Sequence, residues 1–151
     1  MFFQQYYLDC LSHASYLIGD RTTGTAVVVD PQRDVSGYLE DARTNGFTIT
    51  HIIETHFHAD FVSGHLDLAA KSGAKIVFGP TARPAFSAHV ATDGEILQVG
   101  EVTIKVLHTP GHTTESVTYL LRDEQGKDVA LFTGDTLFLG DVGRPDLAQK
   151  A

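Results

Sequence analysis

Three histidines and two aspartates stand at spacings that suit a metal ion. The stretch ETHFHAD contains His56 and His58, followed by Asp60. Further along the chain, HTPGH ends in His112 and FTGD ends in Asp135. Two imidazoles and one carboxylate form a facial triad with open positions, which suits non-haem Fe(II). Three imidazoles and one carboxylate would also suit Zn²⁺.

The order of these motifs, more than any one of them, favours a metal site. A His-x-His pair occurs by chance, but such a pair followed by HTPGHT and TGD is far more specific. The other histidines are interpreted differently. We expect His13, His51 and His65 to be core or surface residues, with His65 on a helix two turns beyond the metal end. His89 is interpreted equally well as lining a pocket or as lying on the surface. His108 is expected to hydrogen-bond near the site rather than to bind metal.

Short apolar and β-branched runs between turn residues predict the strands that position these side chains. The expected strands are FFQQYYL, ASYLIG, GTAVVVDP, FTITHIIETH and KIVFGP, followed by two hairpins over residues 95–112 and 115–135. Helical spacing predicts one helix capped by Asp34 and another over residues 60–73. Residues 80–93 are expected to form a loop. This order favours an α/β protein in which helices cover sheets, and not a regular doubly wound one.

The candidate ligands follow the ends of the expected strands, where a rigid scaffold holds them. His56 and His58 come at the end of the FTITHIIETH strand, and the Pro-Gly turn of HTPGH presents His112. Gly134 lets the chain bend after the last strand, so that Asp135 projects past the edge of its sheet. The sequence therefore predicts that ligands from three strand ends converge.

The composition excludes several classes of partner. The 151 residues include 19 acidic and 11 basic ones, for a formal net charge of -8. The basic residues are scattered, so we expect no nucleic-acid partner. No apolar stretch approaches the ~18 residues of a membrane span, and the first residues do not resemble a signal peptide. We therefore expect no membrane partner and a cytoplasmic location. The single cysteine, Cys10, excludes an intramolecular disulfide and is interpreted as a small buried hydrophobe.

Motifs along the whole chain resemble the metallo-β-lactamase superfamily. They are VVVDP, THFHAD, HTPGHT, FTGDTLF and GDVGRPD. Within the superfamily the chain is similar to the glyoxalase II branch, and inside it to the bacterial persulfide dioxygenases, which are often fused to rhodanese domains. The resemblance implies an αβ/βα sandwich that is truncated at the C-terminus. Residues 1–151 would be the N-terminal part of a single domain, without the rest of that domain or any rhodanese domain.

The resemblance also implies roles for individual residues. His56, His112 and Asp135 match the iron ligands. His58 matches a position that binds zinc in the hydrolases and lies beside the iron in the dioxygenases. Asp30 matches a carboxylate that supports the ligands from outside the coordination sphere.

Three more positions separate the two branches of this family. The hydrolases carry HxHxDH, in which the last histidine binds a second metal, whereas this chain has Phe61 there. Loss of that ligand favours a mononuclear centre and leaves Asp60 as a hydrogen-bonding group. Arg144 and Asp146, in GRPD, match a motif of the dioxygenase branch, with a substrate-binding or structural role.

These observations lead to one expected function and two alternatives. The first is oxidation of a low-molecular-weight thiol persulfide by O₂, giving sulfite and the thiol, at a mononuclear Fe(II) centre. One alternative is a Zn(II)-dependent thioesterase of the glyoxalase II type, similar to hydroxyacylglutathione hydrolase. The other is a half-domain that binds metal poorly and only interacts with a partner. Because a sheet of the truncated domain would keep an open apolar face, we expect an oligomer.

Overall fold

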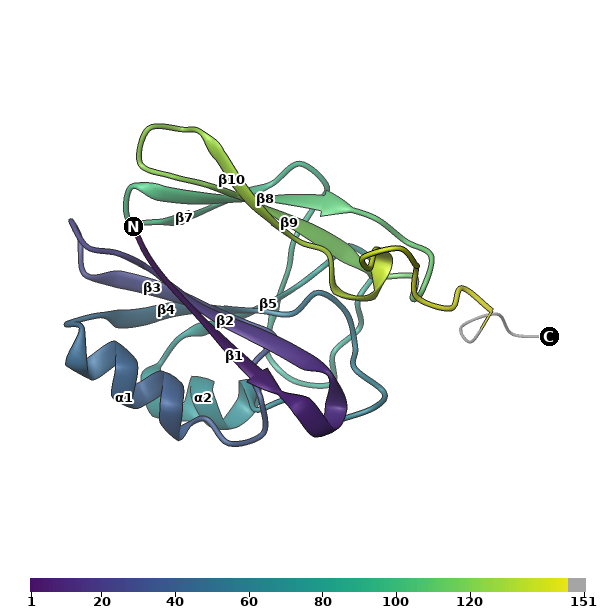
Figure 1. Ribbon diagram of the computed structural model, residues 1–151, viewed down its shortest axis with the longest axis horizontal. Helices are drawn as coiled ribbons and strands as arrows, with labels where there is room; N and C mark the ends of the chain where they lie inside the picture. Colours follow the sequence, from purple (N-terminus) through teal and green to yellow (C-terminus); the bar gives the residue numbers. More distant parts are fainter. Residues whose placement is uncertain (147–151) are drawn as a thin grey trace.

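Two β-sheets face each other in the computed structural model, of which residues 1–146 are described (Figure 1). The first sheet has the strand order β1-β2-β3-β4-β5-β6, and its bounds are β1 Phe2–Leu8, β2 His13–Asp20, β3 Thr25–Val29, β4 Thr48–Ile53, β5 Lys75–Phe78 and β6 His89–Val90. The second has the order β10-β9-β8-β7, with bounds β7 Ile96–Val99, β8 Val102–His108, β9 Val117–Arg122 and β10 Asp128–Phe132. Helices α1 (Ser36–Thr44) and α2 (His65–Ser72) cover the outer face of the first sheet (Figure 1).

The strand directions bring the ends of four strands to one side of the molecule. Strands β3 and β4 pair in parallel, so Asp30 and Glu54 leave the first sheet at the same edge. Strand β9 pairs antiparallel with both β8 and β10, so β8 and β10 also end at a common edge of the second sheet. His112 follows β8, and Asp135 follows β10. The topology therefore delivers polar residues from both sheets to one end of the interface between them.

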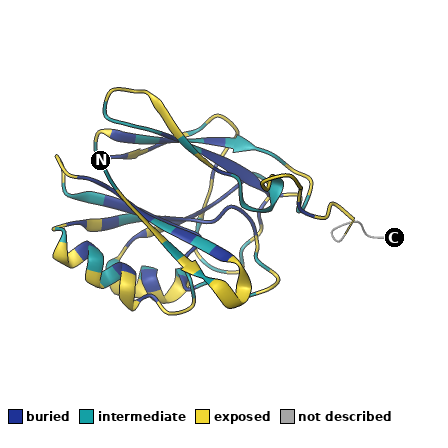
Figure 2. Ribbon diagram, in the orientation of Figure 1, coloured by how far each residue is buried: buried dark blue, intermediate teal, exposed yellow. Residues whose placement is uncertain are grey.

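The core has two layers, one between the sheets and one under the helices (Figure 2). Val27 and Val29 of β3 face the second sheet, while Ala26 and Val28 pack toward the helices. A strand that is buried on both faces needs a continuous apolar run, which explains the sequence TAVVV. Each fully buried valine or leucine side chain stabilises the fold by roughly 1.5–3 kcal/mol relative to an exposed one.

The expected strands, both hairpins and the first helix are confirmed. The prediction that Asp34 caps this helix was wrong, because Val35 holds the N-cap position and makes no side-chain cap hydrogen bond. The carboxylate of Asp34 instead accepts a hydrogen bond of 3.0 Å from the backbone N–H of Ser36, the first residue of α1. Residues 80–93 form mostly a loop, but it contains the short strand β6, which pairs in parallel with β5. Two residues carry too little periodicity to be recognised as a strand in the sequence.

The start of the second helix was predicted wrongly. Helix α2 begins at His65, whereas residues 60–64 are bends and irregular chain, so His65 does not lie two turns into the helix. Gly64 packs so closely on the segment after β3 that a Cβ would lie 2.2 Å from the carbonyl oxygen of Gln32. Its N–H also donates to the carbonyl of Pro31 at 3.1 Å. These tertiary contacts fix the chain before the helix and keep ETHFHAD irregular.

Cys10 was also predicted wrongly, because it is exposed. It lies in the short 3₁₀ turn η1 (Asp9–Leu11), which joins β1 to β2 and has no buried residue. The tip of a hairpin has no core to pack against. Cys10 is therefore exposed despite its apolar side chain.

No helix within residues 1–146 is long and apolar enough to cross a membrane.

Strand β10 forms an edge of the second sheet, and several apolar side chains on it and after it are exposed: Val129, Leu131, Leu137, Phe138, Leu139 and Val142.

Candidate metal centre

Three side chains from three different loops meet at the common edge of the two sheets. His56 follows β4, His112 lies in the loop between β8 and β9, and Asp135 lies in the 3₁₀ turn η2 (Gly134–Thr136) after β10. One ligand atom from each lies within 4.8 Å of the others. The Nε2 atom of His112 is 3.4 Å from a carboxylate oxygen of Asp135. The structure thus brings together two imidazoles and one carboxylate, the set that the motifs indicated.

Hydrogen bonds fix the tautomers of both imidazoles. The Nδ1 atom of His56 lies 3.0 Å from Oγ1 of Thr55, whose hydroxyl donates to Asp30 at 2.9 Å. The hydroxyl has a single hydrogen, so Nδ1 of His56 must be the donor. Nδ1 of His112 lies 3.2 Å from the carbonyl oxygen of Arg144, which can only accept. Nδ1 is therefore the hydrogen-bond donor in both rings, which leaves Nε2 as the atom that each ring can offer to a metal ion. Burial lowers the pKa of His56 and so favours its neutral form.

Two glycines allow the turn that carries Asp135 to approach His56. Gly134 has a φ of 50°, and a Cβ on it would lie 2.4 Å from Oγ1 of Thr55. Gly143 donates its N–H to the carbonyl of Asp135 at 2.8 Å, and a Cβ there would lie 2.1 Å from that oxygen. The TGD and DVGRPD segments therefore pack against the site with no room for side chains at these positions.

Asp30 supports His56 from outside the group of ligands. It has a φ of 47°, a left-handed conformation that aspartate tolerates better than most residues. Its carboxylate accepts hydrogen bonds from the N–H of Thr55 at 2.7 Å, from the hydroxyl of Thr55, and from His58 at 3.1 Å. Burial alone would raise the pKa of Asp30, but the charge and hydrogen bond of His58 and the N–H of Thr55 lower it, so the carboxylate is ionised.

His58 stands beside the ligand group with its Nε2 atom turned away from it. That atom lies 3.1 Å from a carboxylate oxygen of Asp30 and 3.3 Å from one of Glu54. Asp30, Glu54 and His58 form a second buried group of potential ligands, separate from the first. Burial opposes a charge on His58, but the two carboxylates outweigh it and raise the pKa of His58 to about 10. In this arrangement His58 is a cation paired with two carboxylates.

Two residues that the sequence reasoning missed help to build the site. Glu54 is almost fully buried and contacts both His58 and His65. Glu115 is also buried, and its carboxylate accepts a hydrogen bond of 2.9 Å from the N–H of Phe57, which ties the ETHFHAD loop to the loop of His112. A charged residue directly after the apolar run of β4 was the available signal for Glu54.

The aromatic ring of Phe61 packs between two imidazoles. Its centroid is 4.1 Å from that of His13 and 4.5 Å from that of His58. Asp60 is exposed at the rim and has no hydrogen bond to any of residues 1–146, so the structure does not show the hydrogen-bonding role expected of it. His13 is buried in β2.

The other candidate residues lie outside both groups of ligands. Nε2 of His108 contacts the carbonyl of Thr114 at 3.0 Å, so it braces the loop that carries His112 rather than a ligand itself. Arg144 and Asp146 form an exposed ion pair of 2.7 Å. His51 lies within β4, and the exposed His89 pairs with Glu95.

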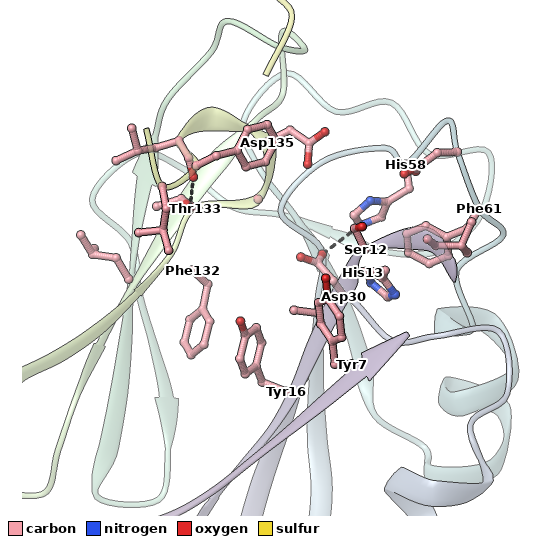
Figure 3. A pocket seen from close by; sticks show the side chains of 18 residues that line it. Tyr7, Ser12, His13, Tyr16, Asp30, His58, Phe61, Phe132, Thr133 and Asp135 are labelled. Carbon is pink, nitrogen blue, oxygen red and sulfur yellow. Dashed lines mark hydrogen bonds and ion pairs between the residues drawn. The ribbon is translucent and has the colours of Figure 1, made fainter. Parts of the chain in front are cut away.

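A cavity of about 700 Å³ adjoins the site. His13, His58 and Phe61 lie on one side of it, and Phe132, Thr133 and Asp135 lie on the other (Figure 3). This volume is within the usual range for small-molecule sites, which is roughly 300–1,000 Å³.

The family model described as "Metallo-beta-lactamase superfamily" matches residues 8–150. The chain belongs to the metallo-β-lactamase superfamily. A hydroxyacylglutathione hydrolase from Bradyrhizobium sp. (strain ORS 278) is 37% identical over 139 residues, which are 89% of this chain and 52% of that relative. The chain thus spans about half the length of the curated relatives it matches.

Solved structures agree with this assignment. A metallo-β-lactamase from Staphylococcus aureus subsp. aureus COL is 46% identical with a TM-score of 0.88, over 98% of this chain and 47% of that one. ETHE1 from Myxococcus xanthus is 33% identical with a TM-score of 0.85, over 98% of this chain and 63% of that one. The expected metallo-β-lactamase fold and the resemblance to the glyoxalase II branch are confirmed.

The separation of the two groups of ligands predicts different metal contents for three alanine variants. His56→Ala and His112→Ala should each lose the bound metal, because each removes one of the two imidazoles that face Asp135. His58→Ala should keep most of it. Metal per chain, measured by mass spectrometry of the dialysed protein, checks this. Equal loss in all three variants would contradict the separation of the two groups.

The Thr55–Asp30 contact makes a further prediction. Asp30→Asn keeps a residue that tolerates left-handed φ but removes the charge, and Thr55→Val removes the hydroxyl that orients His56. Each should weaken metal affinity by roughly 10–100-fold, the usual effect of losing such a supporting partner. The control is Asp41→Asn, which removes a carboxylate bonded to Tyr6 beside α1. Metal affinity, measured by competition with a chelator, should not change in the control. Unchanged affinity in both test variants would restrict Asp30 to a role in folding.

Proposed function

We propose that the protein oxidises a low-molecular-weight thiol persulfide with O₂ at a mononuclear Fe(II) centre. The observation that carries the proposal is the group of two imidazoles and one carboxylate from which His58 is withdrawn. Such a facial set with open positions suits non-haem Fe(II) oxygenases. The balanced reaction is RSS⁻ + O₂ + H₂O → RSH + SO₃²⁻ + H⁺. The outer sulfur supplies the four electrons that reduce O₂.

The residues of the chain would hold and orient the iron and the persulfide. His56 and His112 would bind the metal through their Nε2 atoms, and the carboxylate of Asp135 would offset part of the metal charge. Bound Fe(II) would supply open coordination positions and redox chemistry. The adjoining cavity, lined by Tyr16, Phe61 and other aromatic side chains, offers room for the carrier of the persulfide.

Phe61 supports the mononuclear interpretation. A phenyl ring cannot bind a metal, and this one fills the space between His13 and His58. Because position 61 carries no imidazole, Asp60 also lacks the neighbouring ligand with which it would bind a second ion. An apolar group at this point disfavours a second dication, because the charge would lose its solvation.

A second candidate function is favoured by the names of the curated relatives. Those named are hydroxyacylglutathione hydrolases, for example from Bradyrhizobium and Rhodospirillum rubrum. Zinc would supply a water acidic enough, with a pKa of about 7, to attack a thioester carbonyl. The two functions need different metals and different substrates, which makes them separable.

Anaerobic purification of the full chain, followed by metal analysis and two assays, tests the proposal. We expect about one iron per chain, by analogy with other mononuclear facial-triad sites. O₂ consumption with glutathione persulfide or coenzyme A persulfide should match the sulfite formed. Bound zinc together with hydrolysis of S-lactoylglutathione would support the second candidate and overturn the first. Absence of metal and of both activities would favour a domain that only interacts with a partner.

Phe61→His makes the site match the hydrolase pattern HxHxDH. Under the mononuclear interpretation, the variant should bind more than one zinc per chain after growth with zinc, and should lose dioxygenase activity. Phe61→Leu is the control, because leucine fills much of the same space without a ligand atom. It should cost stability but leave metal content unchanged. Two metals per wild-type chain would contradict the role given to Phe61.

A further inference from the structure

Glu54 is a buried carboxylate that the proposed reaction does not use. It directly follows β4 and is only 1% exposed. Its Oε1 atom accepts hydrogen bonds from the hydroxyl of Ser63 at 2.6 Å and from Nδ1 of His65 at 3.1 Å. Its Oε2 atom has no hydrogen bond from the described residues and lies 3.3 Å from Nε2 of His58. A buried carboxylate is costly unless a charge or donor compensates it, and for Oε2 that partner is His58.

His58 lies close enough to the ligand group that a different direction of its side chain would bring it to the metal. Its ring centroid is 4.2 Å from that of His56, so it stands next to the ligand group. Neither of its nitrogens is among the atoms that meet within 4.8 Å at His56, His112 and Asp135. The direction of its side chain therefore decides whether the metal meets two imidazoles or three.

We propose that Glu54 is a positioning residue that limits the metal centre to two imidazoles by holding His58 outside it. Asp30 shares the contact with His58, but it also supports His56 through Thr55. The carboxylate of Glu54 has no hydrogen bond or ion pair with His56, so its effect on His58 can be separated from support of the ligands. The inference rests on the metal site of the proposed function, but not on the reaction.

The chemical consequence concerns which metal the site prefers. Two imidazoles and one carboxylate leave several positions open and suit Fe(II). A third imidazole would complete the set of nitrogen and oxygen ligands that zinc accepts in a tetrahedral site. Glu54 would thus favour iron over zinc without touching either ion.

The test uses the full chain loaded with Co²⁺, whose unpaired electrons displace the proton NMR signals of bound imidazole N–H groups. The Nδ1–H groups of His56 and His112 are held by hydrogen bonds, so each should give one displaced signal that exchanges slowly with water. We expect two such signals in the wild type, three in Glu54→Gln and two again in the double variant Glu54→Gln/His58→Ala. The preference for Zn²⁺ over Fe²⁺ in direct competition should rise at least about tenfold in Glu54→Gln, a change of about 1.4 kcal/mol.

Ser63→Ala is the matched control. It removes a hydrogen bond to Oε1 of Glu54 but leaves the contact between Oε2 and His58, so two signals and the wild-type metal preference are expected. A merely structural role of Glu54 would give two signals in Glu54→Gln, which would overturn the inference.

The wild type and His58→Ala keep the test decisive if Glu54→Gln does not fold. Two signals in both proteins would support the inference. Three signals in the wild type that fall to two in His58→Ala would overturn it while leaving the metal site intact. Failure of the wild type to bind Co²⁺ would overturn the metal site and the proposed function together.

Discussion

The contact between Asp30 and Thr55 joins the ends of β3 and β4 and orients the first ligand of the site. Thr55 gives both its N–H and its hydroxyl to one carboxylate, at 2.7 and 2.9 Å. The same hydroxyl receives the Nδ1–H of His56. Because β3 and β4 are parallel neighbours, their ends meet, and a short side chain can bridge them. The ligand geometry therefore depends on the alignment of two buried strands, which the apolar core maintains.

Electrostatic balance divides the polar residues into two groups of different character. The group of Asp30, Glu54 and His58 is buried and contains two carboxylates and one cation. The group of His56, His112 and Asp135 has two imidazoles and one carboxylate, and two of its members are only partly buried. The first group satisfies its own charges, whereas the second leaves ligand atoms free. A dication is therefore favoured in the second group, close to the net negative charge of the first.

Both sheets contribute to this site, and the cavity beside it is bounded by residues from both. The ligands lie in loops, but hydrogen bonds between the loops hold them in place, notably those of Phe57 with Glu115 and of His112 with Arg144. A site of this kind can change its chemistry through residues that surround the ligands, such as Phe61 and Glu54, with the ligands kept. This explains how one fold accommodates relatives named as hydrolases beside the dioxygenase proposed here.

The sequence by itself determined the strands other than β6, the two hairpins, the superfamily and the three residues that meet at the sheet edge. These features depend on local patterns: β-branched runs, turn glycines, and histidines placed just after strands. Only the tertiary structure decided the direction of His58, the part played by Glu54, the neighbours of Phe61, the start of α2 and the exposure of Cys10. Each of these depends on contacts between distant parts of the chain, such as His58 with Asp30 or Gly64 with Gln32. The charges and the space around a side chain in the folded protein determine its direction, and its local sequence does not specify them.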